Sequence, residues 1–394
     1  MITIEAIKDF DKFLELKPVW NTLLAESDVD APFLTFEWLS NWWTNFGKGS
    51  ELLILLVKDG SEIIGMAPLM IRRMKYRSLP VRSVTFMANY YSHRSGLILI
   101  RREKEVVSCV LKYLSDYNFD LMYFDFIEKG SATDTSLGSV LDAEKMRHVR
   151  WNGEFSPYIA IDGTWECFLD EKTKSFRKDI KHTNNLFNRG GRYEVIKYSN
   201  TDIDYAIAQL FTISENTWKF ANGTAIINNE KSKMFYRSLA YVAASNNWLN
   251  IYILKLYNQP IAFGYCLRYG EKIYSLKIGY DKRYAELSPG KFLSMYTIKD
   301  AFENCLKEYD FLGANEARKL QWTPLIREHY KYYIFNNNLY GKSLYAFESR
   351  IISKLKKNDW VRGFYSRLQM NKTFKEGKKK LPGQLSGQNN IIEV

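Results

Sequence analysis

Hydrophobic residues form short apolar runs, broken by turn residues, in the first third of the chain. Two such runs, at residues 52–57 and 63–71, flank the sequence KDG at residues 58–60, which is a strong signal for a β-hairpin. Residues 103–116 instead place apolar side chains at helical spacing. The pattern predicts, in chain order, strands over 52–57, 63–71, 82–87 and 96–100, a helix over 103–116 and a buried strand over 121–127.

The same order of elements recurs after residue 245. Residues 250–281 have the pattern of a strand meander with turns at 257–260 and 269–272. A helix over 291–307 and a strand over 309–312 follow. Strands, a helix and a further strand thus occur twice, which indicates two copies of one α/β unit.

Helical patterns account for much of the remaining chain. Residues 1–50 are expected to form a helix, a turn and a second helix, and 165–188, 202–222 and 229–245 are also expected to be helical. Because no long linker separates the two halves, we expect them to pack closely. The expected organisation is a first unit over 1–155, a second over 156–342, a basic helical tail over 343–385 and a disordered end over 386–394.

The composition is that of a folded protein, with 394 residues of which 46% are hydrophobic and 25% charged. The four cysteines lack zinc-ligand or CxxC spacing, the first residues lack a signal-peptide pattern, and no apolar run approaches the roughly 18 residues of a membrane span. We therefore expect a cytoplasmic protein. The net charge is +12, but residues 350–394 alone hold eleven basic and three acidic residues. Because the excess charge lies mostly in this tail, no nucleic-acid partner is expected.

Several catalytic signatures are absent from the sequence, namely GxxxxGK[ST], GxGxxG after a strand, GxSxG and HExxH. The four histidines are His93, His148, His182 and His329, and no two of them lie at ligand spacing. Each is expected to be a surface or packed histidine. A metal cofactor is not expected.

A junction of strand, loop and helix carries the first candidate site, the sequence SPGK at residues 288–291. The first turn of a helix has free backbone N–H groups and binds phosphate readily. Gly290 would permit close approach of the backbone, and Lys291 adds a cation. The alternative is an ordinary helix start capped by Ser288.

Charged residues also crowd just beyond the predicted strand at 309–312, where α/β sheets place ligand crevices. Glu316 and Lys319 are the candidates there, and a solvated ion pair is the alternative. The basic segment 172–185, which includes Arg177, suits an anionic substrate, although most such segments are exposed helical faces.

Taken in this order, these segments resemble the CelD-like (BioF2-like) acetyltransferase family. Its members are GNAT-fold proteins linked to cellulose and exopolysaccharide biosynthesis, and they are relatives of the Fem-type peptidoglycan aminoacyltransferases. The resemblance covers about residues 15–330. It is carried by Trp20, PFLTFEWL at 32–39, DG at 59–60, GMAPL at 65–69, FRK at 176–178, Trp218, GYD at 279–281, SPG at 288–290, DFLG at 310–313, Glu316, Lys319 and Trp322.

The resemblance implies an α/β (α+β) fold of two tandem GNAT-like units, with mixed sheets flanked by helices and an active-site cleft on the second unit. It also implies acyl transfer from acyl-CoA, such as acetyl-CoA, or from an acyl-carrier protein. The expected acceptor is an amine or hydroxyl of an amino sugar or other glycan precursor, small or lipid-linked, in cell-envelope or exopolysaccharide biosynthesis. A Fem-type aminoacyl-tRNA-dependent ligase and a non-catalytic accessory protein of a polysaccharide synthase remain alternatives.

Acyl transfer needs an anchored donor, a stabilised oxyanion and a base for the attacking group. The residues expected to bind the donor are Ser288, Pro289, Gly290, Lys291 and Phe292. The catalytic candidates are Glu316 or Asp281, as base or orienting group, and Lys319. The substrate-binding candidates are Arg177, Trp218, Tyr280, Asp310 and Trp322.

The basic tail has a pattern of its own. Apolar residues between 344 and 368 fall near one helical face, and basic residues lie on the other faces. Such a helix over 343–380 could lie on an anionic membrane surface, peripheral to its inner face. A helix packed on the folded domain, with a solvated basic face, is the alternative.

Overall fold

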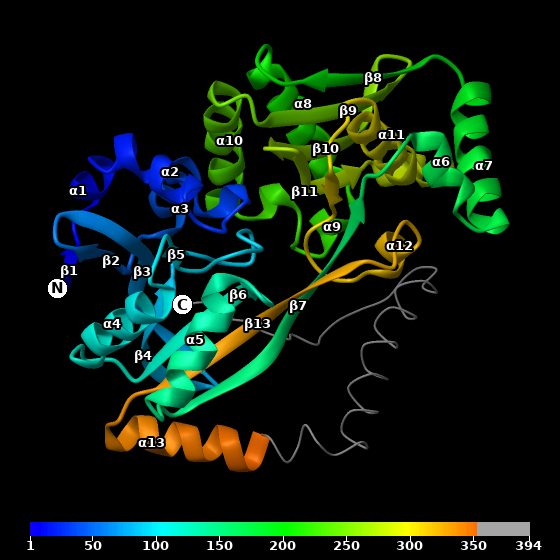
Figure 1. Cartoon of the computed structure of the whole chain (residues 1–394). Helices are drawn as coiled ribbons and strands as arrows, with labels where there is room; N and C mark the ends of the chain where they lie inside the picture. Colours follow the sequence, from blue (N-terminus) through cyan, green and yellow to red (C-terminus); the bar gives the residue numbers. More distant parts are fainter. Residues whose placement is uncertain (353–394) are drawn as a thin grey trace.

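The computed structural model describes residues 1–352, which form two α/β units joined by one continuous mixed sheet (Figure 1). The strand order is β1-β2-β3-β4-β6-β13-β7-β12-β11-β10-β9-β8, and β5 pairs with β3 beside this path. Among these residues, no helix has both the length and the apolar character needed to cross a bilayer.

The first half of the sheet belongs to the N-terminal unit. Its strands are β1 (Ile2–Ile7), β2 (Glu51–Asp59), β3 (Glu62–Tyr76), β4 (Leu79–Phe86), the short β5 (Ile98–Leu99) and β6 (Leu121–Glu128). β1 to β4 pair antiparallel in chain order, and β6 runs parallel to β4. The predicted hairpin is confirmed, because Asp59 and Glu62 pair across the turn that joins β2 and β3.

The second half of the sheet repeats this path. Its strands are β8 (Tyr193–Tyr198), β9 (Leu249–Leu256), β10 (Gln259–Tyr269), β11 (Lys272–Tyr280) and β12 (Glu308–Asp310). β8 to β11 pair antiparallel, and β12 runs parallel to β11. The expected duplication of one α/β unit is therefore confirmed by the strand connections.

Two long strands cross between the units. β7 (His148–Ala160) follows the first unit in sequence, yet its last residues pair with β12. β13 (Ile326–Phe335) follows the second unit in sequence, yet it lies between β6 and β7. Each unit thus completes its sheet with a strand from the other half of the chain. The expected boundary at residue 342 does not follow the sheet, because β13 hydrogen-bonds to a first-unit strand.

Helices cover the faces of both halves of the sheet (Figure 1). Those of the first unit are α1 (Phe10–Leu14), α2 (Lys17–Ala25), α3 (Phe36–Phe46), α4 (Glu103–Ser115) and α5 (Ala132–Ala143). Those of the second are α6 (Trp165–Asp170), α7 (Lys174–Gly190), α8 (Ile203–Glu215), α9 (Trp218–Ala221), α10 (Glu230–Ser245), α11 (Pro289–Glu303) and α12 (Ala317–Leu320), and α13 (Leu339–Ala346) follows β13. The helices expected near 103–116, 229–245 and 291–307 are confirmed as α4, α10 and α11.

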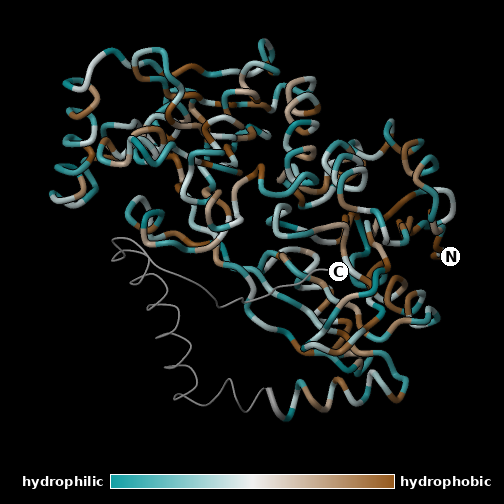
Figure 2. Tube along the Cα trace, turned by 180° about the vertical axis from the view of Figure 1, so that it is seen from behind, coloured by the Kyte–Doolittle hydropathy of each residue, from teal (hydrophilic) through white to brown (hydrophobic). Residues whose placement is uncertain are grey.

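The two units share one hydrophobic core, so the expected close packing of the halves is confirmed. A single cluster of buried residues runs from α3 of the first unit into α10 and β10 of the second. Within it, the ring of Trp38 on α3 lies edge-on to Phe235 on α10, with ring centroids 5.4 Å apart. Figure 2 shows the apolar segments concentrated along the strands inside both units.

Four strands and two helices differ from the prediction. β1 lies where a helix is predicted, and β7, β8, β13, α5 and α12 have no predicted counterpart. β7 contains Gly153 and Pro157, which break a strand pattern, and β13 begins with the polar sequence IREH. These strands form because each finds a hydrogen-bonding partner that lies far away in sequence.

The described start of the tail is packed on the N-terminal unit. Glu348, in the helical turn Phe347–Ile352, is fully buried. Its carboxylate accepts hydrogen bonds from Tyr76 Oη at 2.5 Å, Arg77 Nη2 at 3.1 Å and Trp151 Nε1 at 2.8 Å. The remainder of the expected amphipathic tail and the end at 386–394 lie outside the described residues, and the proposed membrane contact stays a prediction.

The shared core gives a prediction about stability. Trp38 is 1% exposed and also packs edge-on against Phe33, with ring centroids 4.8 Å apart. We expect Trp38→Ala to lower the free energy of unfolding by about 3–5 kcal/mol, because it removes a large buried ring. Denaturant titration measures this loss. Leu339→Ala, at a side chain that is 85% exposed, is the control and should change stability little.

Candidate active site

The candidate site lies where the parallel strands β11 and β12 part. The two strands pair only at residues 272–274 and 308–310, after which they diverge. β11 also contains a β-bulge. Tyr265 of β10 pairs with Lys277 and the next residue, Cys266, pairs with Ser275, so Leu276 has no partner on β10. Such a bulge bends a strand and increases its local twist. A cavity of about 360 Å³ opens in the resulting gap.

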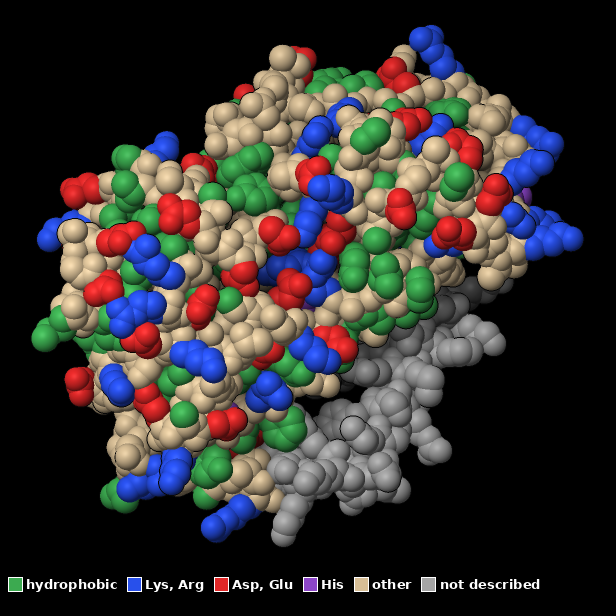
Figure 3. All heavy atoms as spheres, viewed as in Figure 1, with side chains coloured by type: hydrophobic (Ala, Val, Ile, Leu, Met, Phe, Trp, Pro, Cys, Tyr) green, Lys and Arg blue, Asp and Glu red, His purple; other side chains and the backbone are tan. Residues whose placement is uncertain are grey.

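Six segments line this cavity. β11 contributes residues 275–280, the start of α11 contributes Gly290, Lys291 and Ser294, and the end of β12 contributes Tyr309. Residues of α9 (Trp218 and Lys219) and of the segment 311–322 complete most of the wall, and His93 reaches it from the N-terminal unit. Figure 3 shows Lys and Arg side chains gathered in a hollow between the two units.

The equivalent gap in the N-terminal unit is filled. There β4 and β6 pair over residues 83–85 and 121–123 before they part, and the next residues are Phe86 and Phe124. Their rings stack with centroids 4.5 Å apart inside the core. At the corresponding positions of the second unit stand Ser275 and Phe311. β4 pairs with β3 without a register shift, whereas β11 is bulged. A small side chain and a bulge therefore leave the second gap open.

The start of α11 forms one end of the cavity. Ser288 precedes the helix with a φ of +54° and its side chain makes no capping hydrogen bond, so Ser288 is not an ordinary cap. A Cβ atom at Gly290 would lie 3.0 Å from Cδ1 of Tyr280, so any larger residue would require the Tyr280 ring to shift. Lys291 lines the cavity and its ammonium pairs with Asp179 of α7. Phe292 is instead a core residue, 4.1 Å from the ring of Phe187.

Two lysines with lowered pKa values border the cavity. Burial, together with the charges of Arg318 and Lys277, lowers the pKa of Lys219 to about 8. Lys219 Nζ donates a hydrogen bond to the Ile278 carbonyl at 2.8 Å. Burial and the charge of Lys319 likewise lower the pKa of Lys277 to about 8. Within residues 1–352 no carboxylate pairs with Lys277, and its ammonium lies 5.1 Å from the ring centroid of Tyr91.

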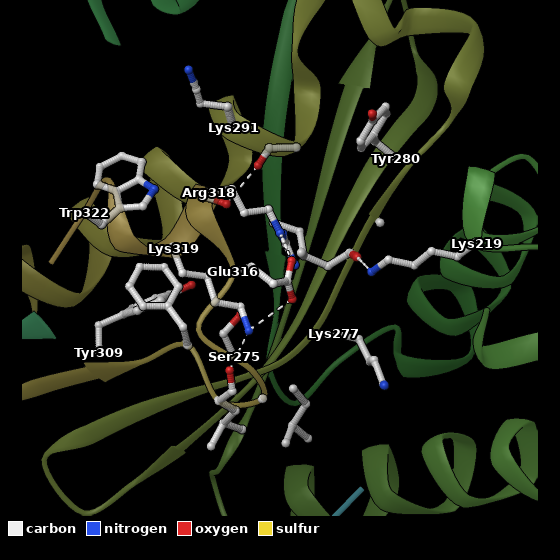
Figure 4. A pocket seen from close by; sticks show the side chains of 18 of the residues that line it. Lys219, Ser275, Lys277, Tyr280, Lys291, Tyr309, Glu316, Arg318, Lys319 and Trp322 are labelled. Carbon is white, nitrogen blue, oxygen red and sulfur yellow. Dashed lines mark hydrogen bonds and ion pairs between the residues drawn. The ribbon is translucent and has the colours of Figure 1, made fainter. Parts of the chain in front are cut away.

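Glu316, Arg318 and Lys319 form a charged cluster after β12 (Figure 4). Lys319 Nζ donates to the carbonyls of Leu312 at 2.6 Å and Ala314 at 3.0 Å, and it lies 3.4 Å from Glu316 Oε1. Burial opposes ionisation of Glu316, but the hydrogen bond from Arg318 and the charge of Lys319 prevail and lower its pKa to about 2. A carboxylate with so low a pKa is a weak base, and this favours the orienting role among the two expected for Glu316.

A histidine and a carboxylate from the N-terminal unit reach the same region. The segment after β4 carries His93, which is buried and lines the cavity. Its Nδ1 atom lies 3.3 Å from Oε2 of Glu154 on β7. His93 is therefore a packed histidine, as expected, but one that also lines the cavity.

The structure brings some of the predicted residues to the cavity and leaves others away from it. Those that line it are Trp218, Tyr280, Gly290, Lys291, Glu316, Lys319 and Trp322. Ser288, Pro289, Phe292, Arg177, Asp281 and Asp310 do not line it. Arg177 Nη1 contacts Asp170, and Asp281 is held by two hydrogen bonds from Arg283 Nε, at 3.1 and 3.0 Å. Asp310 is fully buried and pairs with Arg94 and Arg327. Their predicted contacts with substrate or donor find no support in these positions.

Five residues of the site were not among those predicted from the sequence: Lys219, Lys277, Ser275, His93 and Glu154. Ser275 and Lys277 lie in a run of strand residues, where no sequence signal marks the bulge. Lys219 could have been noticed, because it directly follows Trp218 of the family pattern. Among residues 1–352, no three His, Cys, Asp or Glu side chains come together as a metal-binding group.

A comparison with known protein families matches the part of the chain that contains most of the cavity residues. Residues 174–332 match a family described as an acetyltransferase (GNAT) domain. No match was found among curated proteins. The solved structure of FemX is similar, with a TM-score of 0.57 and 12% identity over 85% of this chain and 98% of FemX.

Two further structures share the architecture. L-PGS from Bacillus licheniformis has a TM-score of 0.52 and 13% identity over 86% of this chain and 96% of its own. The C-terminal domain (DUF2156) of a putative lysylphosphatidylglycerol synthetase from Agrobacterium fabrum has a TM-score of 0.52 and 9% identity over 84% and 95%. At these identities the likeness concerns the fold. The expected fold class is confirmed, and the match of residues 174–332 to a GNAT-type acetyltransferase domain supports the expectation of an acyltransferase.

Proposed function

We propose that the protein transfers an acyl group from an acyl-CoA to an amine or hydroxyl of an amino sugar or related glycan precursor. The observation that carries this proposal is the open gap between β11 and β12, set against the filled gap of the N-terminal unit. An extended thioester donor needs a narrow slot beside a strand edge. Of the two equivalent gaps, the one between β11 and β12 provides such a slot, and the one between β4 and β6 is filled by Phe86 and Phe124. The resemblance to CelD-like proteins supports the choice of a glycan acceptor.

The donor would lie along the free edge of β11. Beyond Tyr274 this edge no longer pairs with β12, so its backbone N–H and C=O groups can form hydrogen bonds with the amide groups of a pantetheine arm. The pyrophosphate would sit at the start of α11, where the N–H of Gly290 points out of the first turn and Lys291 adds positive charge. Lys219 and Lys277 would strengthen the attraction for a polyanionic donor, because each carries more charge when an anion raises its pKa.

The charged cluster after β12 would serve the acceptor side. Lys319 holds the segment 312–314 through two carbonyls, and Glu316 holds both Arg318 and Lys319. This arrangement would present Arg318 to an anionic group of the acceptor, with the exposed ring of Trp218 available for a sugar face. An aminoacyl-tRNA donor, the Fem-type alternative, is distinguished from acyl-CoA by the binding experiment below.

Filling the second gap should abolish donor binding. We expect Ser275→Phe to place a ring where Phe86 stands in the first unit and to remove stabilisation by acetyl-CoA or a longer acyl-CoA. A ligand at about 100 times its dissociation constant stabilises the native protein by roughly 2.7 kcal/mol, which a thermal-shift assay detects. Ser61→Phe, in the exposed turn between β2 and β3, is the matched control and should keep the shift.

A Ser275→Phe variant that folds and keeps the full shift would show that the donor does not use this gap. A wild-type protein that no acyl-CoA stabilises would contradict the choice of donor. Repeating the assay with an acyl-carrier protein and with aminoacyl-tRNA then identifies the donor class.

Removing the carboxylate of Glu316 should slow turnover. We expect Glu316→Ala to lower kcat by about tenfold or more, since hydrogen bonds to charged groups are worth about 1.5–3 kcal/mol and 1.4 kcal/mol corresponds to a factor of ten. Release of free CoA in the presence of an amino-sugar acceptor measures kcat. Glu303→Ala, which removes an exposed ion pair with Lys299 on α11, should leave kcat unchanged. Unchanged turnover in a folded Glu316→Ala protein would exclude Glu316 from the mechanism.

A further inference from the structure

The N-terminal unit places a side chain inside the cavity of the C-terminal unit. His93 belongs to the segment between β4 and β5, and its φ is +52°. The next residue, Arg94, pairs with the fully buried Asp310 at the end of β12, and Ser95 N donates to the Phe126 carbonyl at 3.1 Å. These contacts anchor the segment on both halves of the sheet. They hold His93 beside the point where β11 and β12 part.

His93 and Glu154 are arranged as a base and the group that orients it. Burial opposes ionisation of Glu154, but its hydrogen bond with His93 holds the pKa of this carboxyl below its usual range. The ionised carboxylate accepts a hydrogen bond from Nδ1–H of His93 at 3.3 Å, which selects the tautomer with a lone pair on Nε2. Within residues 1–352 nothing else hydrogen-bonds to this ring.

The surroundings of His93 keep it neutral. Burial lowers the pKa of His93, and the nearby charges of Lys277 and Arg94 lower it further, while Glu154 acts in the opposite direction. Lys319 is the other cation close by. The imidazole is therefore an unprotonated acceptor at neutral pH and is able to take a proton.

Gly313 marks the place where these groups converge. A Cβ atom at this residue would lie 3.2 Å from Lys319 Nζ, 3.9 Å from His93 Cε1 and 4.0 Å from Glu154 Oε1. Gly313 has a φ of +58° and no side chain, so the space between the three groups stays open to the cavity. A group bound there touches a base and a cation at once.

The other cavity residues are less suited to accept a proton. Glu316 has a pKa of about 2, and Lys219 and Lys319 donate hydrogen bonds to backbone carbonyls. Lys277 faces the rings of Tyr91 and Tyr236, and with a pKa of about 8 it is mostly an ammonium without a lone pair at neutral pH. His93 is the one group of this set that combines a free lone pair with a dedicated orienting partner.

We propose that His93 is the general base of the acyl transfer and that Glu154 is its positioning residue, so that the N-terminal unit completes the active site. This inference rests on the function proposed above. The neutral amine attacks the thioester carbonyl, and a C–N bond forms while the proton of the attacking nitrogen passes to Nε2. The C–S bond then breaks and the thiolate of CoA leaves. The imidazolium returns its proton to the thiolate or to water, so atoms and charge balance.

The test compares His93→Gln, His93→Ala and Glu154→Gln in the full chain, with His182→Gln on the exposed face of α7 as the matched control. We expect His93→Gln to lower kcat by about 10²–10⁴-fold while acyl-CoA still gives its full thermal shift. Imidazole added to His93→Ala should restore part of kcat, which a purely structural role would not allow. The control should match the wild type.

The pH profile gives a second readout. In the wild type, kcat should fall as the pH drops through the pKa of His93, which lies below the ordinary value of 6.5. His93→Gln should lose this acid limb. Because Glu154 raises the pKa of His93, Glu154→Gln should move the limb to lower pH and reduce kcat on the plateau. Lys277→Met should lower donor affinity and keep the limb, but move it to higher pH, because the charge of Lys277 lowers the pKa of His93.

The outcomes separate the two proposals. A His93→Gln enzyme with wild-type kcat and an unchanged acid limb overturns the base assignment, and so does loss of the limb in Lys277→Met. A wild-type protein that no acyl-CoA stabilises overturns the proposed function itself, whatever the histidine variants do.

Discussion

The buried charge cluster around Asp310 holds the two units and the cavity in place. Asp310 is the last residue of β12 that pairs with β11, and it has no exposed surface. It accepts hydrogen bonds from Arg94 of the first unit, from Arg327 of β13 at 2.9 Å and from the backbone N–H of Leu312 at 2.8 Å. Removing one member of such a set leaves an unpaired buried charge, which is strongly destabilising. This cluster therefore sets the position of His93, the course of residues 311–313 and the junction between the two halves of the sheet.

The two halves of the duplicated fold differ in the gap between their diverging parallel strands. Both halves contain four antiparallel strands, a helix and a parallel strand that diverges from the fourth. In the first half, Phe86 and Phe124 stack in the gap and extend the core. In the second, Ser275 and the bulge at Leu276 keep it open. The first unit contributes stability through its filled gap. Its segment between β4 and β5, which carries His93, reaches the open gap of the second unit.

The electrostatics of the cavity suit a negatively charged ligand. Lys219, Lys277 and Lys319 all have lowered pKa values, since each is buried among other cations. Bringing positive charges together in this way is unfavourable without a counter-ion, and Glu316 and Glu154 offset only part of it. A polyanion that entered the cavity would relieve the repulsion between the lysines and restore their charges. The same property accounts for the low pKa of Glu316, whose carboxylate is stabilised by the surrounding cations.

Local sequence patterns were enough to predict the duplicated α/β plan, the hairpin at residues 58–60, the helices α4, α10 and α11, and the approximate place of the site between 288 and 322. These features arise from local periodicity and turn residues, which the chain carries within each segment. The sequence also pointed to Glu316, Lys319, Gly290 and Lys291, which line the cavity. Asp281, Asp310, Arg177 and Phe292 have suitable side chains, but they are engaged elsewhere by ion pairs or core packing.

Other features became visible only in the folded chain: the exchange of β7 and β13, the open and filled gaps, and the approach of His93 and Glu154 to the cavity. Each of these depends on pairs of residues far apart in sequence, such as Arg94 and Asp310 or β13 and β6. Hydrophobic periodicity reports which face of an element is buried, but it carries no information about the partner that buries it. The chemistry of this site is shared between two units, and so it appears only when both are folded together.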